Sequence, residues 1–169
     1  MTDEQLHITP RLARILMSEE AIYGLILVSG MIVVSGTNSG TALNAFTTVA
    51  VTVVVFFAAH VYAGTLGRLA ATDGHAGLGA SLRASLRQSG GMLLASVAPL
   101  VVLILGATQV IDDTTALWTA LIVDTVILGA LGWVAVARWS THWLPRILSA
   151  LLTAGFGGIL IALKAIIHH

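Results

Sequence analysis

Cysteine is absent from this chain of 169 residues. Its absence excludes disulfide bonds, thiolate nucleophiles, cysteine-ligated metals and c-type haem attachment. Charged residues are also scarce, at 9% of the chain, whereas an ordinary globular domain has about 25%. Hydrophobic residues make up 57%. A lipid bilayer is therefore the expected solvent, and most soluble fold classes are excluded.

The signatures of common enzymes and binding proteins are missing as well. The sequence has no His-rich metal spacing, no Gly-x-Ser-x-Gly nucleophile elbow, no phosphate-binding loop and no nucleic-acid-binding signature. Its best-placed acids, Glu20 and Asp124, belong to opposite halves of the predicted membrane domain. We therefore expect no enzymatic activity, no catalytic residue, no metal, no cofactor and no nucleic-acid partner.

What the sequence does contain is a series of apolar segments, each close to the roughly 20 residues that cross a hydrocarbon core of about 30 Å. They are residues 20–35, 44–66, 91–107, 115–137 and 147–167. Backbone groups in lipid must be hydrogen-bonded within their own segment, so even the valine-rich stretch 49–55 is predicted to be helical. We expect an all-α fold, with residues 1–169 forming a single membrane domain, a polytopic bundle of five transmembrane helices.

Short amphipathic helices are predicted at the membrane surface. Residues 10–17 begin with a proline, which suits a helix start, and place their apolar side chains on one face. In the connection after the second span, leucines recur at positions 78, 82 and 86, with Arg83 and Arg87 beside them. This pattern favours a helix lying on the cytoplasmic leaflet, where the arginines either anchor the topology or bind anionic lipid.

The distribution of Lys and Arg predicts the orientation. Every arginine belongs to the N-terminal segment or to the connections after the second and fourth spans, which lie on one side of the predicted membrane. The other side has an uncharged loop, an acidic loop with Asp112 and Asp113, and Lys164 near the end of the last span. We expect a multi-pass protein of the plasma membrane with a cytoplasmic N-terminus and an external C-terminus.

The first candidate site pairs the first two spans at their cytoplasmic ends. Glu19, Glu20 and Tyr23 open the first span, and His60 reaches a similar depth near the end of the second. A carboxylate, a phenol and an imidazole at one level favour proton handling, with Thr52 on the His60 stripe as a candidate relay group. The alternative is structural, since acids complement a helix N-terminus and an imidazole can simply bond a neighbour.

The second candidate site is the ionisable residue deepest in a predicted span. Asp124 lies about nine residues into the fourth span, and an acid at that depth is costly enough to face the bundle interior. Lys164 near the outer end of the last span either snorkels outward or bends inward toward Asp124. Asp124 is thus a structural partner of Lys164 or Thr125, or a relay for a proton or ion.

Small residues recur at every fourth position of the last span. Such rows let helices approach closely in lipid, so they predict either a homo-oligomer interface or packing within the monomer. The row comprises Ala150, Ala154, Gly158 and Ala162.

Two pieces of the sequence, Glu20-Ala-Ile-Tyr-Gly24 and Val55-Phe-Phe-Ala-Ala-His60-Val-Tyr-Ala63, carry a family resemblance. They resemble a group of small uncharacterised actinobacterial five-span integral membrane proteins, and the likeness covers chiefly residues 18–68. The resemblance implies a shared fold in which the two pieces belong together, and it implies no activity. The chain is more faintly similar to prokaryotic lysosomal-type potassium channels. Their Phe-Ser-Asp motif is replaced here by Ile22-Tyr23-Gly24, which argues against a potassium filter.

Two functions of different classes are consistent with these patterns. The first is a small membrane channel or transporter that handles protons or a small ion through the Glu-Tyr-His cluster. The second is a non-conducting membrane scaffold or partner subunit, in contact with membrane lipids and assembled through its spans. Flux from the purified protein in liposomes distinguishes the two.

Overall fold

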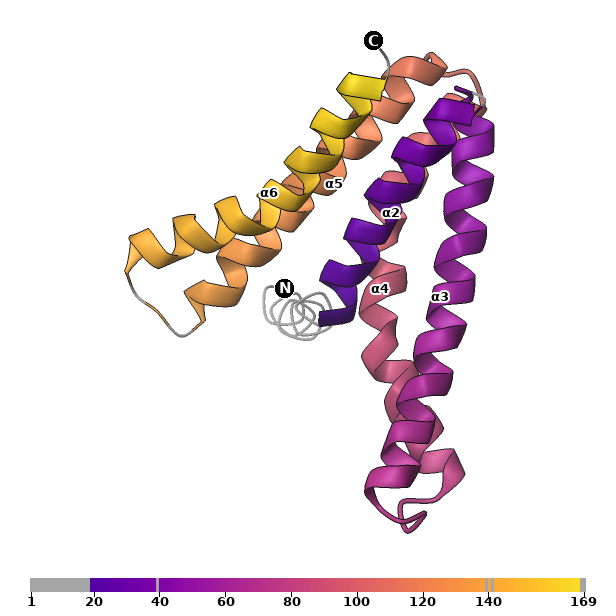
Figure 1. Ribbon diagram of the computed structural model, residues 1–169, viewed down its shortest axis with the longest axis vertical. Helices are drawn as coiled ribbons and strands as arrows, with labels where there is room; N and C mark the ends of the chain where they lie inside the picture. Colours follow the sequence, from indigo (N-terminus) through magenta and orange to yellow (C-terminus); the bar gives the residue numbers. More distant parts are fainter. Residues whose placement is uncertain (1–18, 39, 139, 141, 168–169) are drawn as a thin grey trace, which may run out of the picture.

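The computed structural model describes residues 19–38, 40–138, 140 and 142–167, and these residues form five α-helices and no strand (Figure 1). The helices are α2 (Glu19–Asn38), α3 (Ala42–Ala71), α4 (Leu78–Ala107), α5 (Asp113–Ala137) and α6 (Trp143–Ile167). The predicted all-α class is confirmed for this part of the chain. The amphipathic helix predicted at residues 10–17 lies outside it.

Four of the helices, α3 to α6, are long and apolar enough to cross a membrane. α3 and α4 have 30 residues each, and α5 and α6 have 25 each. At about 1.5 Å per residue, even the shorter pair exceeds the roughly 30 Å of a hydrocarbon core. α2 has 20 residues, starts with two acids and is not one of the four. The structure therefore supports four of the five predicted spans.

Residues 78–87 do not form a separate surface helix, so this part of the prediction is wrong. They are the first turns of α4, which continues without a break through Gly90 and Gly91. α4 is continuous because one face of its first turns packs against α3. The predicted surface helix would instead have left the bundle at this point. At Gly64 of α3, a Cβ would lie 3.0 Å from the Ser85 hydroxyl oxygen. The buried side chains on this face recur at four-residue spacing and are Ser81, Ser85 and Ser89.

α3 also continues past its predicted end at residue 66, to Ala71. A short turn then reverses the chain, using Gly74 and Gly77 with positive φ angles of 79° and 73°. Such angles favour glycine, because a Cβ is strained there. At about 1.5 Å per residue, each arm of the α3–α4 hairpin is about 45 Å long, so the hairpin extends beyond a hydrocarbon core of about 30 Å.

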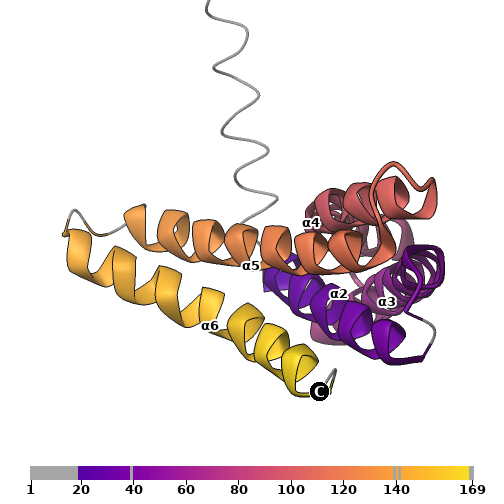
Figure 2. The ribbon, with the colours of Figure 1, turned by 90° about the horizontal axis from the view of Figure 1, so that it is seen from above.

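The helices form two hairpins, α3–α4 and α5–α6, which meet at one end and diverge toward their turns, with α2 between them (Figures 1 and 2). At the shared end a Cβ on Gly106 would lie 2.6 Å from the Cβ of Ala42 and would also collide with Ala116. The backbone N–H of Ala42 donates to Asp113 Oδ1 at 2.8 Å. Three helix ends are thereby fixed at one level. The α3–α4 turn and the start of α2 lie away from this end (Figure 1).

Two apolar clusters stabilise α2 between the hairpins. The larger one joins α2 to α3, α4 and α5 on the side of the shared end, and contains Val28, Ile32, Val49, Val53, Leu103, Leu117 and Leu121 among others. The smaller one lies nearer the start of α2 and contains Ala21, Leu25, Ala95, Leu128 and Leu131. Burial of these side chains positions the polar residues of α2 described below.

Candidate functional site

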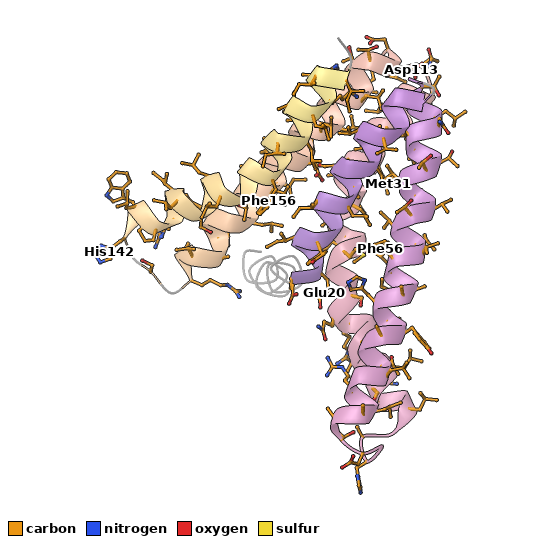
Figure 3. All side chains as sticks on the ribbon, in the orientation of Figure 1. Glu20, Met31, Phe56, Asp113, His142 and Phe156 are labelled. Atoms are coloured by element: carbon orange, nitrogen blue, oxygen red, sulfur yellow. The ribbon has the colours of Figure 1, made fainter. Side chains whose placement is uncertain are left out.

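A polar cavity opens beside the first turn of α2. We call it the Glu20 cavity; it has a volume of about 410 Å³ and is lined by Glu19, Glu20, Tyr23, His60 and Gln88. Figure 3 labels Glu20 at the start of α2, next to the middle of the α3–α4 hairpin. Four of the seven predicted candidates therefore line one cavity. Gln88 was not predicted.

A smaller cavity adjoins the first and is more enclosed. This Ser85 cavity has a volume of about 140 Å³ and shares Glu20, His60 and Gln88 with the Glu20 cavity. Its remaining lining comes from the facing sides of α3 and α4, from Ala63, Gly64, Ser85 and Ser89. The Ser85 hydroxyl oxygen is buried and has no hydrogen-bond partner among the described residues. The cavity space therefore extends from α2 into the α3–α4 interface.

The Glu20 carboxylate is held by a chain of hydrogen bonds across three helices. Its side chain is only 8% exposed, and its Oε1 accepts from Gln88 Nε2 of α4. Gln88 Oε1 in turn accepts from Arg68 Nη2 of α3. A guanidinium can only donate, so the arginine fixes the amide orientation that turns the NH₂ group toward Glu20. The positive end of the α2 dipole favours an acid at this position as well.

His60 lines both cavities, and one of its ring nitrogens is bonded within its own helix. Its Nδ1 lies 3.1 Å from the carbonyl oxygen of Phe56, one turn earlier in α3. A carbonyl oxygen can only accept, so Nδ1 must carry the hydrogen in this bond. Nε2 is then the acceptor in the neutral ring and a donor in the charged ring. Within the described residues no hydrogen bond or ion pair joins His60 to Glu20, so they are linked by the space they share.

Glu19 and Tyr23 form the rim of the Glu20 cavity. Glu19 is exposed, and the Tyr23 side chain is 60% exposed. Thr52 is half-buried and is not among the residues that line either cavity. On α3, Thr52 lies beside the row of buried side chains that includes Val49 and Val53.

Asp124 is completely buried between helices, as predicted for an acid within a span. Its Oδ2 accepts a hydrogen bond from the hydroxyl of Ser29 on α2, and its Oδ1 has no partner among the described residues. The expected contact with Thr125 is absent because that hydroxyl donates to the carbonyl of Leu121 in its own helix, at 2.8 Å. Ser29, which was not predicted, takes that place because α2 packs against α5.

Lys164 bends inward rather than outward. Its side chain is 1% exposed, and its Nζ has no hydrogen-bond partner within the described residues. The Nζ lies 5.2 Å from the ring centroid of Trp118, within range of a cation–π contact. Among these residues no ion pair joins Lys164 to Asp124, so the suggested pairing of the two is not formed in this structure.

An apolar layer separates the two polar regions. Along α2, Leu25 lies between Glu20 and Ser29, and it is completely buried. Leu128 of α5, one turn from Asp124, is completely buried in the same cluster. Glu20 and Ser29 are about 13 Å apart along α2, from a rise of about 1.5 Å per residue. Among the described residues, buried apolar side chains therefore lie between the Glu20 cavity and the Ser29–Asp124 pair.

The small-residue row of α6 is divided between two environments. Ala150 and Ala154 are half-buried, and a Cβ on Gly129 of α5 would lie 3.4 Å from the Ala154 Cβ. Gly158 and Ala162 are exposed, and a Cβ on Gly158 would meet nothing within 4 Å. Packing within the monomer thus accounts for the first half of the row and leaves the second half uncovered.

Outside the spans, Asp112 caps the start of α5. Its Oδ2 accepts from the backbone N–H of Thr115 at 2.7 Å, and its Oδ1 accepts from the Thr115 hydroxyl at 2.8 Å. These bonds stabilise the charged form, the backbone bond most, and hold the pKa of the Asp112 carboxyl below its usual value. Within the described residues, no group of three or more His, Asp or Glu side chains is placed to hold a metal ion.

The chain matches no known family model, no curated protein and no solved structure. The function must therefore be argued from the cavities and the buried polar groups themselves.

Proposed function

We propose that this protein moves protons across the cell membrane and takes them up from the cytoplasm at Glu20 and His60. The observation that carries the proposal is the Glu20 cavity, where a nearly buried carboxylate and an imidazole line one opening of about 410 Å³. Proton carriers need groups that exchange protons with water yet face the bundle interior. Tyr23 and Glu19 at the rim extend the polar surface outward.

The second station of the proposed pathway is Asp124. It is buried in the bundle and bonded to Ser29, on the same helix that carries Glu20. Within the described residues its Oδ1 has no hydrogen-bond partner, so this oxygen is available to a water molecule or a migrating proton, and the Lys164 Nζ, also without a partner there, can donate to water. The layer at Leu25 and Leu128 blocks direct passage. We propose that movement of α2 against α5 opens this layer, which makes the present conformation the closed one.

The proposed topology has five spans, with α2 as the first, the N-terminus in the cytoplasm and the C-terminus outside. The 20 residues of α2 give a length of about 30 Å, matched to a hydrocarbon core. Arg68, Arg83 and Arg87 gather at the α3–α4 turn and Asp112 and Asp113 at the shared end, as the positive-inside rule requires.

Cysteine labelling tests this topology, because the chain has no native cysteine. Val110→Cys in the external turn should react with an impermeant maleimide in intact cells. Ala76→Cys and His142→Cys, both exposed, should react only after the membrane is opened. Labelling of Val110→Cys and Ala76→Cys from the same side would overturn the orientation.

Flux of the purified protein in liposomes tests the function. A pH gradient imposed across vesicles with an internal pH dye should collapse faster with protein than without it. If collapse of the pH gradient requires sodium or potassium, the transported species is instead a small ion. If the folded protein gives no flux of any of these, the alternative is supported: a non-conducting scaffold or partner subunit.

A further inference from the structure

An apolar groove runs along the outside of the α3–α4 hairpin, separate from the polar cavities. Its volume is about 440 Å³, and its lining is almost entirely hydrocarbon. The lining includes Phe57, Val61 and Tyr62 from α3 and Leu78, Leu82 and Leu86 from α4. The three leucines are 65%, 41% and 43% exposed. Where such an apolar surface extends beyond the hydrocarbon core, it marks a site of lipid or protein contact.

The depth of the groove identifies the kind of occupant. Ala42 and Gly106 share one level at the external end of the hairpin, and a hydrocarbon core of about 30 Å takes up about 20 residues from there. Counting along the helices, the inner boundary falls near Tyr62 on α3 and near Arg87 on α4. Phe57 and Val61 are then at acyl-chain depth, whereas Leu82 and Leu78 are at headgroup depth. A phospholipid extends across these two depths.

The charge beside the groove indicates which phospholipid. Arg83 and Arg87 are in the same turns of α4 as the groove residues Leu82 and Leu86, so they lie at the same depth as the groove. Both are exposed, and neither has an acidic partner within the described part of the chain. The Glu20 carboxylate of α2 instead accepts a hydrogen bond from Gln88. Two unpaired cations at headgroup depth favour a negatively charged headgroup.

We propose that this groove is a binding site for an anionic phospholipid of the inner leaflet. One acyl chain lies along Phe57, Val61 and Leu86, and the phosphate is bound by Arg83 and Arg87. The proposal depends on α4 being one continuous helix. If residues 78–87 lay flat on the membrane, there would be no groove between them and α3. The site is independent of proton transfer at Glu20, and it holds whether or not the protein conducts.

The test is native mass spectrometry of the full chain, extracted from vesicles of equal phosphatidylcholine and phosphatidylglycerol. We expect the wild type to retain phosphatidylglycerol in preference to phosphatidylcholine. An arginine in contact with the bound headgroup contributes about a fivefold preference. Arg87→Gln should therefore lower the preference about fivefold, and Arg83→Gln with Arg87→Gln about 30-fold. Arg138→Gln, an exposed arginine of the other hairpin, is the control and should leave the preference unchanged.

A second pair of variants tests the groove itself. Ala58 lines the groove and Ala59 does not, although both are exposed on α3. Ala58→Phe should fill the groove and abolish retained phosphatidylglycerol, while Ala59→Phe should retain it. The proposal is overturned if the wild type retains both lipids equally, or if the two phenylalanine variants behave alike. It is also overturned if the groove variants instead convert a dimer to a monomer, because the occupant would then be a second copy of the chain.

Discussion

Gln88 of α4 donates a hydrogen bond to the Glu20 carboxylate of α2, and this bond connects helices that are far apart in the sequence. The same amide accepts from Arg68 of α3. The Gln88 amide therefore lies between the Arg68 guanidinium and the Glu20 carboxylate and keeps the two from pairing directly. Glu20 is held at the cavity wall by a neutral group and retains its second oxygen for other partners.

The Glu20–Gln88 bond should appear as a coupling free energy. Bonds to charged groups contribute about 1.5 to 3 kcal/mol in soluble proteins, and side-chain bonds between membrane helices average about 0.6 kcal/mol. We expect a value between these, about 1 kcal/mol, because Glu20 lies at the edge of the core. Unfolding in detergent of Glu20→Ala, Gln88→Ala and the double variant gives the coupling. Strictly additive effects would show that the bond contributes nothing.

Asp124→Asn distinguishes a relay from a structural acid. Asparagine keeps an oxygen that accepts from Ser29 and removes the charge, so the variant should fold with stability close to that of the wild type. It cannot carry a proton, and we expect its flux to fall at least about tenfold, since even a modest loss of about 1.4 kcal/mol has that effect. Thr125→Val, which removes a hydroxyl bonded only to its own helix, is the control and should conduct normally. Unchanged flux in Asp124→Asn would make this acid structural.

The Asp112 cap predicts a pH dependence of stability. Because the folded-state pKa of Asp112 is lower than its usual value of 3.8, its contribution is fully present above that value and is lost as the pH falls through the lower folded-state pKa. Asp112→Asn keeps a capping side chain without the charge. The difference in melting temperature between the two proteins should be constant at neutral pH and shrink below about pH 3.8. A difference in melting temperature that increases as the pH falls would contradict this prediction.

Two glycines of α6, at positions 155 and 157, should respond differently to substitution by alanine. A Cβ on Gly157 would collide with the Thr125 side chain and lie 3.0 Å from its Cα, so Gly157→Ala should destabilise the α5–α6 hairpin by about 1 to 3 kcal/mol. Gly155→Ala meets nothing within 4 Å and should be neutral or stabilising by up to about 1 kcal/mol, the difference in helix propensity. Thermal unfolding in detergent measures both.

Gly158→Ile tests whether two copies of the chain associate through α6. We propose that the exposed half of the small-residue row, Gly158 and Ala162, is where two copies meet, because no helix of the described chain covers it. The variant should keep its fold and lose crosslinked dimer in mild detergent. If wild type and variant are both monomeric, the row serves packing within the monomer only.

The sequence predicted the fold where a single physical constraint dominates. Long apolar runs must be helical in lipid, and for this reason the positions of α3, α5 and α6 were predicted to within a few residues. The start of α4 was missed because residues 78–87 were assigned to a helix on the membrane surface. Packing of Ser81, Ser85 and Ser89 against α3 keeps α4 continuous, despite the poor helix propensity of Gly90 and Gly91.

The candidate site was predictable only in part. The depth of Glu20 and His60 follows from counting residues along neighbouring spans, so the sequence alone predicts that they lie at one level. Their partners depend on which helices adjoin, and along the chain α2 is separated from α4 by α3 and from α5 by the whole α3–α4 hairpin. Gln88 and Ser29 were therefore missed, although each hydrogen-bonds a predicted acid.

Proton flux as a function of pH tests the central claim most directly. Imidazoles ordinarily titrate between about pH 5 and 8, so flux in proteoliposomes should change across that range in the wild type and lose that change in His60→Ala. Glu20→Gln should lower the flux throughout. His75→Ala is the matched control, since that imidazole makes the same kind of bond, from Nδ1 to the Thr72 carbonyl at 2.8 Å, outside the cavity. Well-folded Glu20→Gln and His60→Ala proteins with wild-type flux and wild-type pH dependence would contradict the account.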